Sequence, residues 1–67
     1  MGGVILGFSV KQARQYAGLT QVEMAKRLGV SRDVYRRIEI SPETTSIAMA
    51  KKISEVVGIP IDQIFFA

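Results

Sequence analysis

The chain has 67 residues, which is enough for one small domain with a thin hydrophobic core. It contains neither cysteine nor histidine, so disulfide bridges, Cys/His zinc sites, cysteine nucleophiles and histidine general bases are all excluded. The formal net charge is +3, and the basic excess lies in residues 1–41, which carry seven Lys or Arg against three Asp or Glu. That part of the chain is therefore the better candidate to meet a polyanion.

Helix-capping residues predict five helices in succession. Ser9 followed by Gln12, and Thr20 followed by Glu23, both have the spacing of a capping box. The predicted helices cover about residues 10–18, 21–28, 32–40, 46–57 and 60–65, with a loop at 41–45 and either Thr45 or Ser46 as the cap of the fourth helix. We therefore expect an all-α, compact five-helix fold, in which Val4–Leu6 is the one stretch that competes as a strand.

Apolar residues recur at helical spacing, which predicts the side chains that pack together. The predicted core comprises Met24, Ala25, Leu28, Tyr35, Ile38, Ile47, Ala50, Ile53, Val56, Val57, Ile59, Ile61, Ile64 and Phe65. The apolar residues in excess of this core are Val4, Ile5, Leu6, Phe8, Val22, Ile40 and Phe66. These either pack onto the domain or form a surface for a second copy or another protein. No apolar run approaches the ~18 residues of a membrane span, and the N-terminus lacks signal-peptide features, so we expect a cytoplasmic protein.

Residues 20–39 hold the strongest functional signal. Gly29 can adopt a positive φ and Ser31 caps the following helix at once, so the turn is too short for an antiparallel helix pair. The third helix must then project one face outward, and that face carries Arg32, Asp33, Arg36 and Arg37. Arginine binds O6 and N7 of guanine in the major groove of DNA, whereas the simpler interpretation of such a face is a solvated surface. The tight turn and the two caps favour the first interpretation.

The pattern as a whole resembles the lambda-repressor/Cro-like, XRE-type helix-turn-helix domains. The matching segments are Leu19-Thr20-Gln21, Met24-Ala25, Leu28-Gly29-Val30-Ser31, Ile38-Glu39 and residues 57–65. The resemblance covers about residues 9–66 and leaves residues 1–8 as an apolar N-terminal extension. It implies a compact five-helix domain that binds double-stranded operator DNA as a homodimer, with the second and third helices as its reading motif.

The resemblance also implies roles for individual residues. The predicted DNA-binding residues are Arg32, Asp33 and Arg37 at base-reading positions, together with Gln21, Ser31, Val34, Arg36, Ser41 and Thr44. Among these, Gln21 is expected to contact phosphate and brace a base-reading side chain, while Ser31 and Val34 face the DNA backbone. Arg14 and Glu39 match a structural ion pair of the family, and the apolar neighbours of Arg14 favour that scaffold role because a half-buried charge needs a partner.

The chain departs from the family after Glu39. Such domains usually continue with Asn-Gly and one or two basic residues that touch phosphates, whereas this chain continues with residues 40–45, Ile-Ser-Pro-Glu-Thr-Thr. Backbone N–H and hydroxyl groups of Ser41, Thr44 and Thr45 can still reach phosphate. Loss of the cationic contacts predicts a modest nonspecific affinity with a flatter salt dependence.

Two functions remain open at this point. The first is a small sequence-specific transcription regulator, such as a Cro-like repressor of a prophage or a stand-alone regulator without a sensor domain. The second keeps the fold but binds a protein, as an antirepressor or antitoxin-type module whose partner is a repressor or a toxin. The acidic side chain in the 41–45 loop and the excess apolar residues favour this second function. We expect neither an enzyme nor a metal or cofactor site, because the carboxylates form no close helical pair and no phosphate-binding glycine loop occurs.

Overall fold

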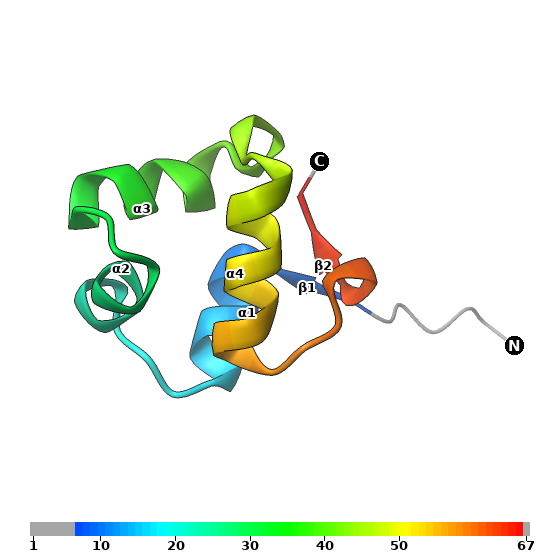
Figure 1. Ribbon diagram of the computed structural model, residues 1–67. Helices are drawn as coiled ribbons and strands as arrows, with labels where there is room; N and C mark the ends of the chain where they lie inside the picture. The colour runs from blue at the N-terminus through cyan, green and yellow to red at the C-terminus, as the bar shows by residue number, and fades with distance from the viewer. Residues whose placement is uncertain (1–6, 67) are drawn as a thin grey trace, which may run out of the picture.

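The computed structural model describes residues 7–66 (Figure 1). In chain order, the elements are β1 (Phe8–Ser9), α1 (Val10–Tyr16), α2 (Gln21–Leu28), α3 (Arg32–Ile40), the short 3-10 helix η1 (Pro42–Thr44), α4 (Ile47–Val57), the short 3-10 helix η2 (Ile61–Gln63) and β2 (Ile64–Phe65). In Figure 1, α2 and α3 lie to the left of α4 and the two strands lie to its right. The first four predicted helices are thus present within two residues of their expected bounds. No helix in residues 7–66 is long and apolar enough to cross a membrane.

A side-chain cap opens each of the four α-helices. Two of the caps are the predicted capping boxes, Ser9 with Gln12 and Thr20 with Glu23, each with both of its hydrogen bonds in place. Ser31 opens α3, and Ser46 rather than Thr45 opens α4 by accepting the backbone N–H of Met49 at 3.1 Å. These bonds satisfy N–H groups that the first turn of a helix otherwise leaves free, so each helix begins at a residue that the sequence specifies.

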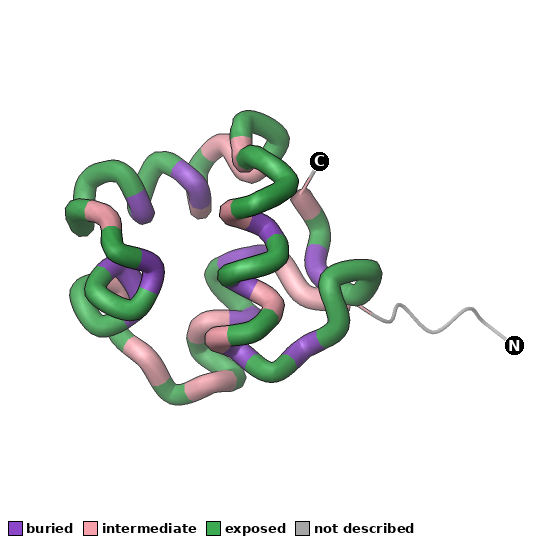
Figure 2. The backbone as a smooth tube through the Cα atoms, in the orientation of Figure 1, coloured by how far each residue is buried: buried purple, intermediate pink, exposed green. Residues whose placement is uncertain are grey.

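All four helices contribute buried residues to one core, and Figure 2 marks these residues along the backbone in purple. The core cluster comprises Val10, Ala13, Met24, Ala25, Leu28, Tyr35, Ile38, Ile53, Val57, Ile59 and Ile64. The core prediction is wrong for three residues, because Ile47, Ile61 and Phe65 are 77%, 39% and 50% exposed. Ile47 lies in the first turn of α4, ahead of Ala50, where the buried stripe of that helix begins. Alternate residues of a strand face opposite ways, so Phe65 is exposed where its neighbour in β2 is buried.

The predicted fifth helix is wrong. Residues 60–65 form the single turn η2 and then β2, which pairs in parallel with β1, so the fold is mostly helical rather than all-α. Phe8 lies opposite Ile64 and Ser9 lies opposite Phe65. The chain before α1 therefore supplies hydrogen-bonding groups that favour a strand, and isoleucine and phenylalanine side chains suit one. β1 spans the expected boundary between residues 8 and 9, and the candidate strand at Val4–Leu6 lies outside the described residues.

Candidate nucleic-acid interface

The turn between α2 and α3 sets the direction in which α3 projects. α2 ends at Gly29, whose φ of +73° lies in the left-handed region that glycine adopts without steric cost. Its N–H donates to the carbonyl of Lys26 at 3.2 Å, and the N–H of Val30 donates to that of Ala25 at 3.0 Å. Only Gly29, Val30 and Ser31 separate the two helices, and Figure 1 shows α2 nearly end-on while α3 lies across the view. The two helices therefore cross steeply, as the short turn predicts.

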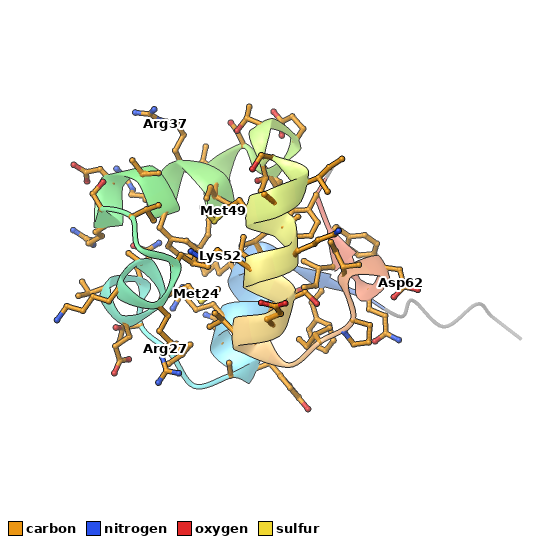
Figure 3. The ribbon with its side chains drawn as sticks, in the orientation of Figure 1. Met24, Arg27, Arg37, Met49, Lys52 and Asp62 are labelled. Atoms are coloured by element: carbon orange, nitrogen blue, oxygen red, sulfur yellow. The ribbon has the colours of Figure 1, made fainter. Side chains whose placement is uncertain are left out.

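One side of α3 faces solvent and the other faces the core (Figure 2). Tyr35 and Ile38, on the inner side, are 0% and 8% exposed. The four charged residues expected on the other side, Arg32, Asp33, Arg36 and Arg37, are all exposed. Within residues 7–66, no hydrogen bond or ion pair engages their side chains. Figure 3 shows Arg37 extending away from the body of the molecule, so its guanidinium group is available to a partner.

Ile40 belongs to the same surface as the charged residues. It lines a shallow hollow together with Asp33, Arg36 and Arg37, because residues three, four and seven positions apart share one side of a helix. Arg32 extends this surface toward α2, where it lines a second hollow with Gln21 and other residues. Arg32, Asp33, Arg36, Arg37 and Ile40 together form the outer face of α3.

Glu39 organises the inner side of α3. Its carboxylate accepts hydrogen bonds from Nε of Arg14 at 2.7 Å, from the hydroxyl of Tyr35 at 2.6 Å and from Nε2 of Gln21 at 3.0 Å. The Arg14 and Glu39 side chains are only 11% and 7% exposed and form the expected ion pair. Arg14 also donates to the carbonyl of Leu19 at 2.9 Å. One carboxylate thus ties α3 to α1 and to the first residue of α2.

The hydrogen bonds around Glu39 also set its charge. Burial by itself raises the pKa of the Glu39 carboxyl, but the hydrogen bonds from Arg14, Tyr35 and Gln21 outweigh burial and hold that pKa below its ordinary value. For Tyr35, burial and then the hydrogen bond to Glu39 raise the pKa of the phenol far above its usual range. Glu39 is therefore a charged acceptor and Tyr35 a neutral donor at neutral pH.

Tyr35 and Gln21 have partners that the sequence pattern does not predict. From the sequence, Tyr35 is expected only in the core, but in the structure its hydroxyl donates to Glu39. Residues four positions apart are neighbours on a helix, so the spacing of Tyr35 and Glu39 is the signal from which this contact could have been found. Gln21 is expected to brace a base-reading side chain, but in the structure its side-chain amide donates to Glu39. The structure therefore places Gln21 between the scaffold and the hollow that it shares with Arg32.

The segment after α3 is a turn of 3-10 helix rather than an irregular loop. Thr44 Oγ1 donates to the carbonyl of Ser41 at 2.7 Å, so the proton of this hydroxyl is used inside the turn. A mainly apolar groove beside the turn is lined by Val34, Arg37, Ile38, Thr44, Thr45, Ser46 and Met49. The structure thus brings Val34, Arg37 and Thr44 together, whereas Ser41 is half-buried and does not line the groove.

Comparison with known proteins places this arrangement among related chains. The chain matches the helix-turn-helix family over residues 10–64. It is 39% identical over 56 residues to an uncharacterized HTH-type transcriptional regulator of Methanocaldococcus jannaschii, a match that covers 84% of this chain and 85% of the relative. It is 41% identical over 49 residues to a protein of Archaeoglobus fulgidus named as an HTH-type transcriptional regulatory protein, a match that covers 73% of this chain and 16% of that protein. No solved structure matches the chain significantly.

Proposed function

The chain belongs to the XRE-type helix-turn-helix family, and we propose that it is a small, sequence-specific DNA-binding transcription regulator. The observation that carries the proposal is the outer face of α3, where Arg32, Arg36 and Arg37 are exposed and have no partner within residues 7–66. The Glu39 network supports it, because it holds the opposite side of the same helix against α1 and α2. Recognition then needs no rearrangement of the helix that performs it.

The dimensions and chemistry of α3 suit the major groove of DNA. The helix has nine residues and is therefore about 13 Å long. The major groove is about 12 Å wide, which is enough to admit an α-helix. In the proposal, Arg32 and Arg37 donate two hydrogen bonds each to guanine, and Asp33 accepts from the amino group of cytosine. Arg36, on the same surface, binds either a base edge or a phosphate.

Polar groups at the ends of α2 and α3 supply phosphate contacts in this proposal. The free N–H groups and the dipole at the start of α2, next to Gln21, attract an anion. The Ser31 hydroxyl accepts from the N–H of Val34 at 3.2 Å and keeps its own proton to donate. After α3, the backbone N–H groups of Ser41 and Thr44 donate to the carbonyls of Arg37 and Ser41, so they are not free for the phosphate contact that the sequence predicts. Ser41 offers its hydroxyl instead, and the exposed Glu43 beside it opposes a phosphate. We therefore expect the salt dependence of binding to be flatter than several Lys or Arg contacts would produce.

A homodimer on a two-fold operator extends the proposal. One α3 offers five residues to the groove and so reads only a few base pairs. A two-fold axis places a second α3 about one turn of DNA away and doubles the length of sequence that is read. In this proposal, the protein acts in the cytoplasm as a Cro-like repressor of a prophage. Light scattering with and without the selected duplex tests the dimer, for which we expect two chains per duplex.

Exposed apolar side chains favour a second candidate function, the binding of another protein as an antirepressor or antitoxin-type module. Val22 and Ile40 are 46% and 66% exposed. This candidate predicts a stoichiometric protein complex that weakens when Val22→Ser or Ile40→Ser is introduced. It also predicts that the wild-type chain shows no preference for any duplex.

Selection from random duplexes, followed by titration at several salt concentrations, tests the regulator proposal. We expect a preferred sequence, from which Arg32→Ala or Arg37→Ala removes about 1–3 kcal/mol of binding free energy and relaxes the preference at one base pair. Arg27→Ala is the matched control, because Figure 3 shows Arg27 and Arg37 on opposite sides of the molecule. A wild-type chain without any sequence preference, or equal losses in the Arg27 and Arg37 variants, contradicts the proposal.

A further inference from the structure

The last residue of α3 is an exposed isoleucine framed by arginines. Ile40 is 66% exposed, and the hollow that it lines contains no other apolar residue, only Asp33, Arg36 and Arg37. Ile40 lies three residues after Arg37 and four after Arg36, so all three side chains leave the helix on the same side. This surface therefore offers an apolar group and two guanidinium groups to the same partner.

The charges around Ile40 restrict what can cover it. A second copy of this surface would bring Arg36 and Arg37 of both chains together with only one carboxylate, Asp33, from each. An uncharged protein surface would supply no charged acceptor at all, so either partner would remove water from guanidinium groups at a high cost in free energy. DNA supplies acceptors to both guanidinium groups through phosphates and through O6 and N7 of guanine. The major groove also presents one apolar group on its base edges, the C5-methyl group of thymine.

We propose that Ile40 contacts the C5-methyl group of a thymine in the operator and selects T·A at one position for each α3. This inference rests on the proposed function and assigns a specificity-determining contact to a residue at which the family resemblance predicts a polar phosphate contact. Ile40 lies about 4 to 6 Å along the helix axis from Arg36 and Arg37, which corresponds to one or two base-pair steps. The selected thymine therefore lies within about two base pairs of the position that Arg36 or Arg37 reads.

Replacement of single thymines by uracil tests the contact. Uracil keeps the base pair and the O4 acceptor but lacks the C5-methyl group, so only an apolar contact is lost. In the selected duplex, we expect one thymine per half-site at which uracil weakens wild-type binding about fourfold, the effect of removing one buried methyl group. All other thymines are expected to tolerate the replacement with a smaller change.

The Ile40→Ala variant should bind the thymine and uracil duplexes at that position equally. Ile47→Ala is the matched control, because it removes an exposed apolar group of the same kind from α4, outside the outer face of α3. This control should keep the wild-type ratio between the two duplexes. Ile40→Ala should also leave the slope of binding against salt unchanged, because it removes no charge. Ile40→Val, which preserves most of the side chain, should retain part of the ratio and provides the same test if the alanine variant fails to fold.

The outcomes separate this inference from the function on which it rests. A wild-type chain without sequence preference overturns both. A wild-type chain that selects a sequence but tolerates uracil at every thymine overturns the Ile40 contact alone, and so does an Ile40→Ala variant that keeps the wild-type ratio. Dissociation of a DNA-free complex by Ile40→Ala, measured by light scattering, also overturns it and assigns Ile40 to a protein interface.

Discussion

The two sides of α3 use charge in opposite ways. On the inner side, Glu39 is nearly buried and accepts hydrogen bonds from Arg14, Gln21 and Tyr35. On the outer face, the arginine side chains are exposed and no partner engages them in the described part of the chain. The difference follows from solvation, because removing an ion from water costs several kcal/mol unless it is paired, whereas an exposed guanidinium group stays hydrated and available.

This comparison shows that one helix of nine residues separates stability from recognition. Groups on the inner side are satisfied within the fold, so they fix the position of α3. Groups on the outer face are satisfied only by water or by a partner. Substitutions on the two sides should therefore change different measurements, and the predictions below test that separation in order of decreasing effect.

The largest effect is expected from Glu39→Ala. This change leaves the partly buried guanidinium of Arg14 and the hydroxyl of Tyr35 without their acceptor. Loss of one partner of a fully buried ion pair costs about 3–5 kcal/mol, and the loss of three hydrogen bonds to one carboxylate should approach the lower end of that range. That is comparable to the whole stability expected of a chain of this size, so the variant should be largely unfolded at 25 °C. Urea denaturation followed by far-UV circular dichroism measures the change.

Two controls make the Glu39 result specific. Glu43→Ala removes an exposed carboxylate and should change the free energy of unfolding by less than about 0.5 kcal/mol. Arg37→Ala should leave stability similarly unchanged while it weakens DNA binding. Equal destabilisation by the Glu39 and Arg37 variants would show that the two sides of α3 are not separate.

A smaller loss is expected from Tyr35→Phe. The ring still fills the core, and only the 2.6 Å hydrogen bond to Glu39 disappears, which is worth about 1.5 kcal/mol for a charged acceptor. Tyr16→Phe is the matched control, because the Tyr16 side chain is 68% exposed and should tolerate the change. The same urea titration measures both variants, and a Tyr35 variant as stable as the Tyr16 variant would remove Tyr35 from the network.

The smallest effect is the pH dependence that Glu39 produces. Its folded-state pKa lies below the ordinary value of 4.5, so the stabilisation is complete above about pH 5 and decreases as pH falls through 4.5 toward the folded-state pKa. Between pH 6 and 4, the Glu39 carboxyl begins to bind a proton in the unfolded chain, whereas in the folded chain it does so only at lower pH. Glu39→Gln should therefore flatten the loss of stability over this range. Glu23 has a lowered pKa of its own, caused by its hydrogen bonds with Thr20, and contributes to the slope that remains. An unchanged acid slope in Glu39→Gln would assign the pH dependence to other carboxylates.

The local order of residues determined the four α-helices and the exposure of the outer face. Ser9, Thr20 and Ser31 cap helices through groups only three residues away, and Gly29 turns the chain through its own φ. The spacing of Tyr35 and other inward residues left the charged residues of α3 on the opposite side. These features depend on neighbours within one or two helical turns, so the sequence by itself was sufficient to predict them.

Only the tertiary structure decided the features whose partners are distant along the chain. Residues 61–65 became a turn and a strand because Phe8 and Ser9 lie beside them and supply backbone hydrogen bonds. Gln21 bonds to Glu39, 18 residues away, because the steep crossing of α2 and α3 brings their side chains together. Ile47 continues the apolar spacing of α4 yet faces solvent, because burial depends on which elements cover a position and not on the spacing alone.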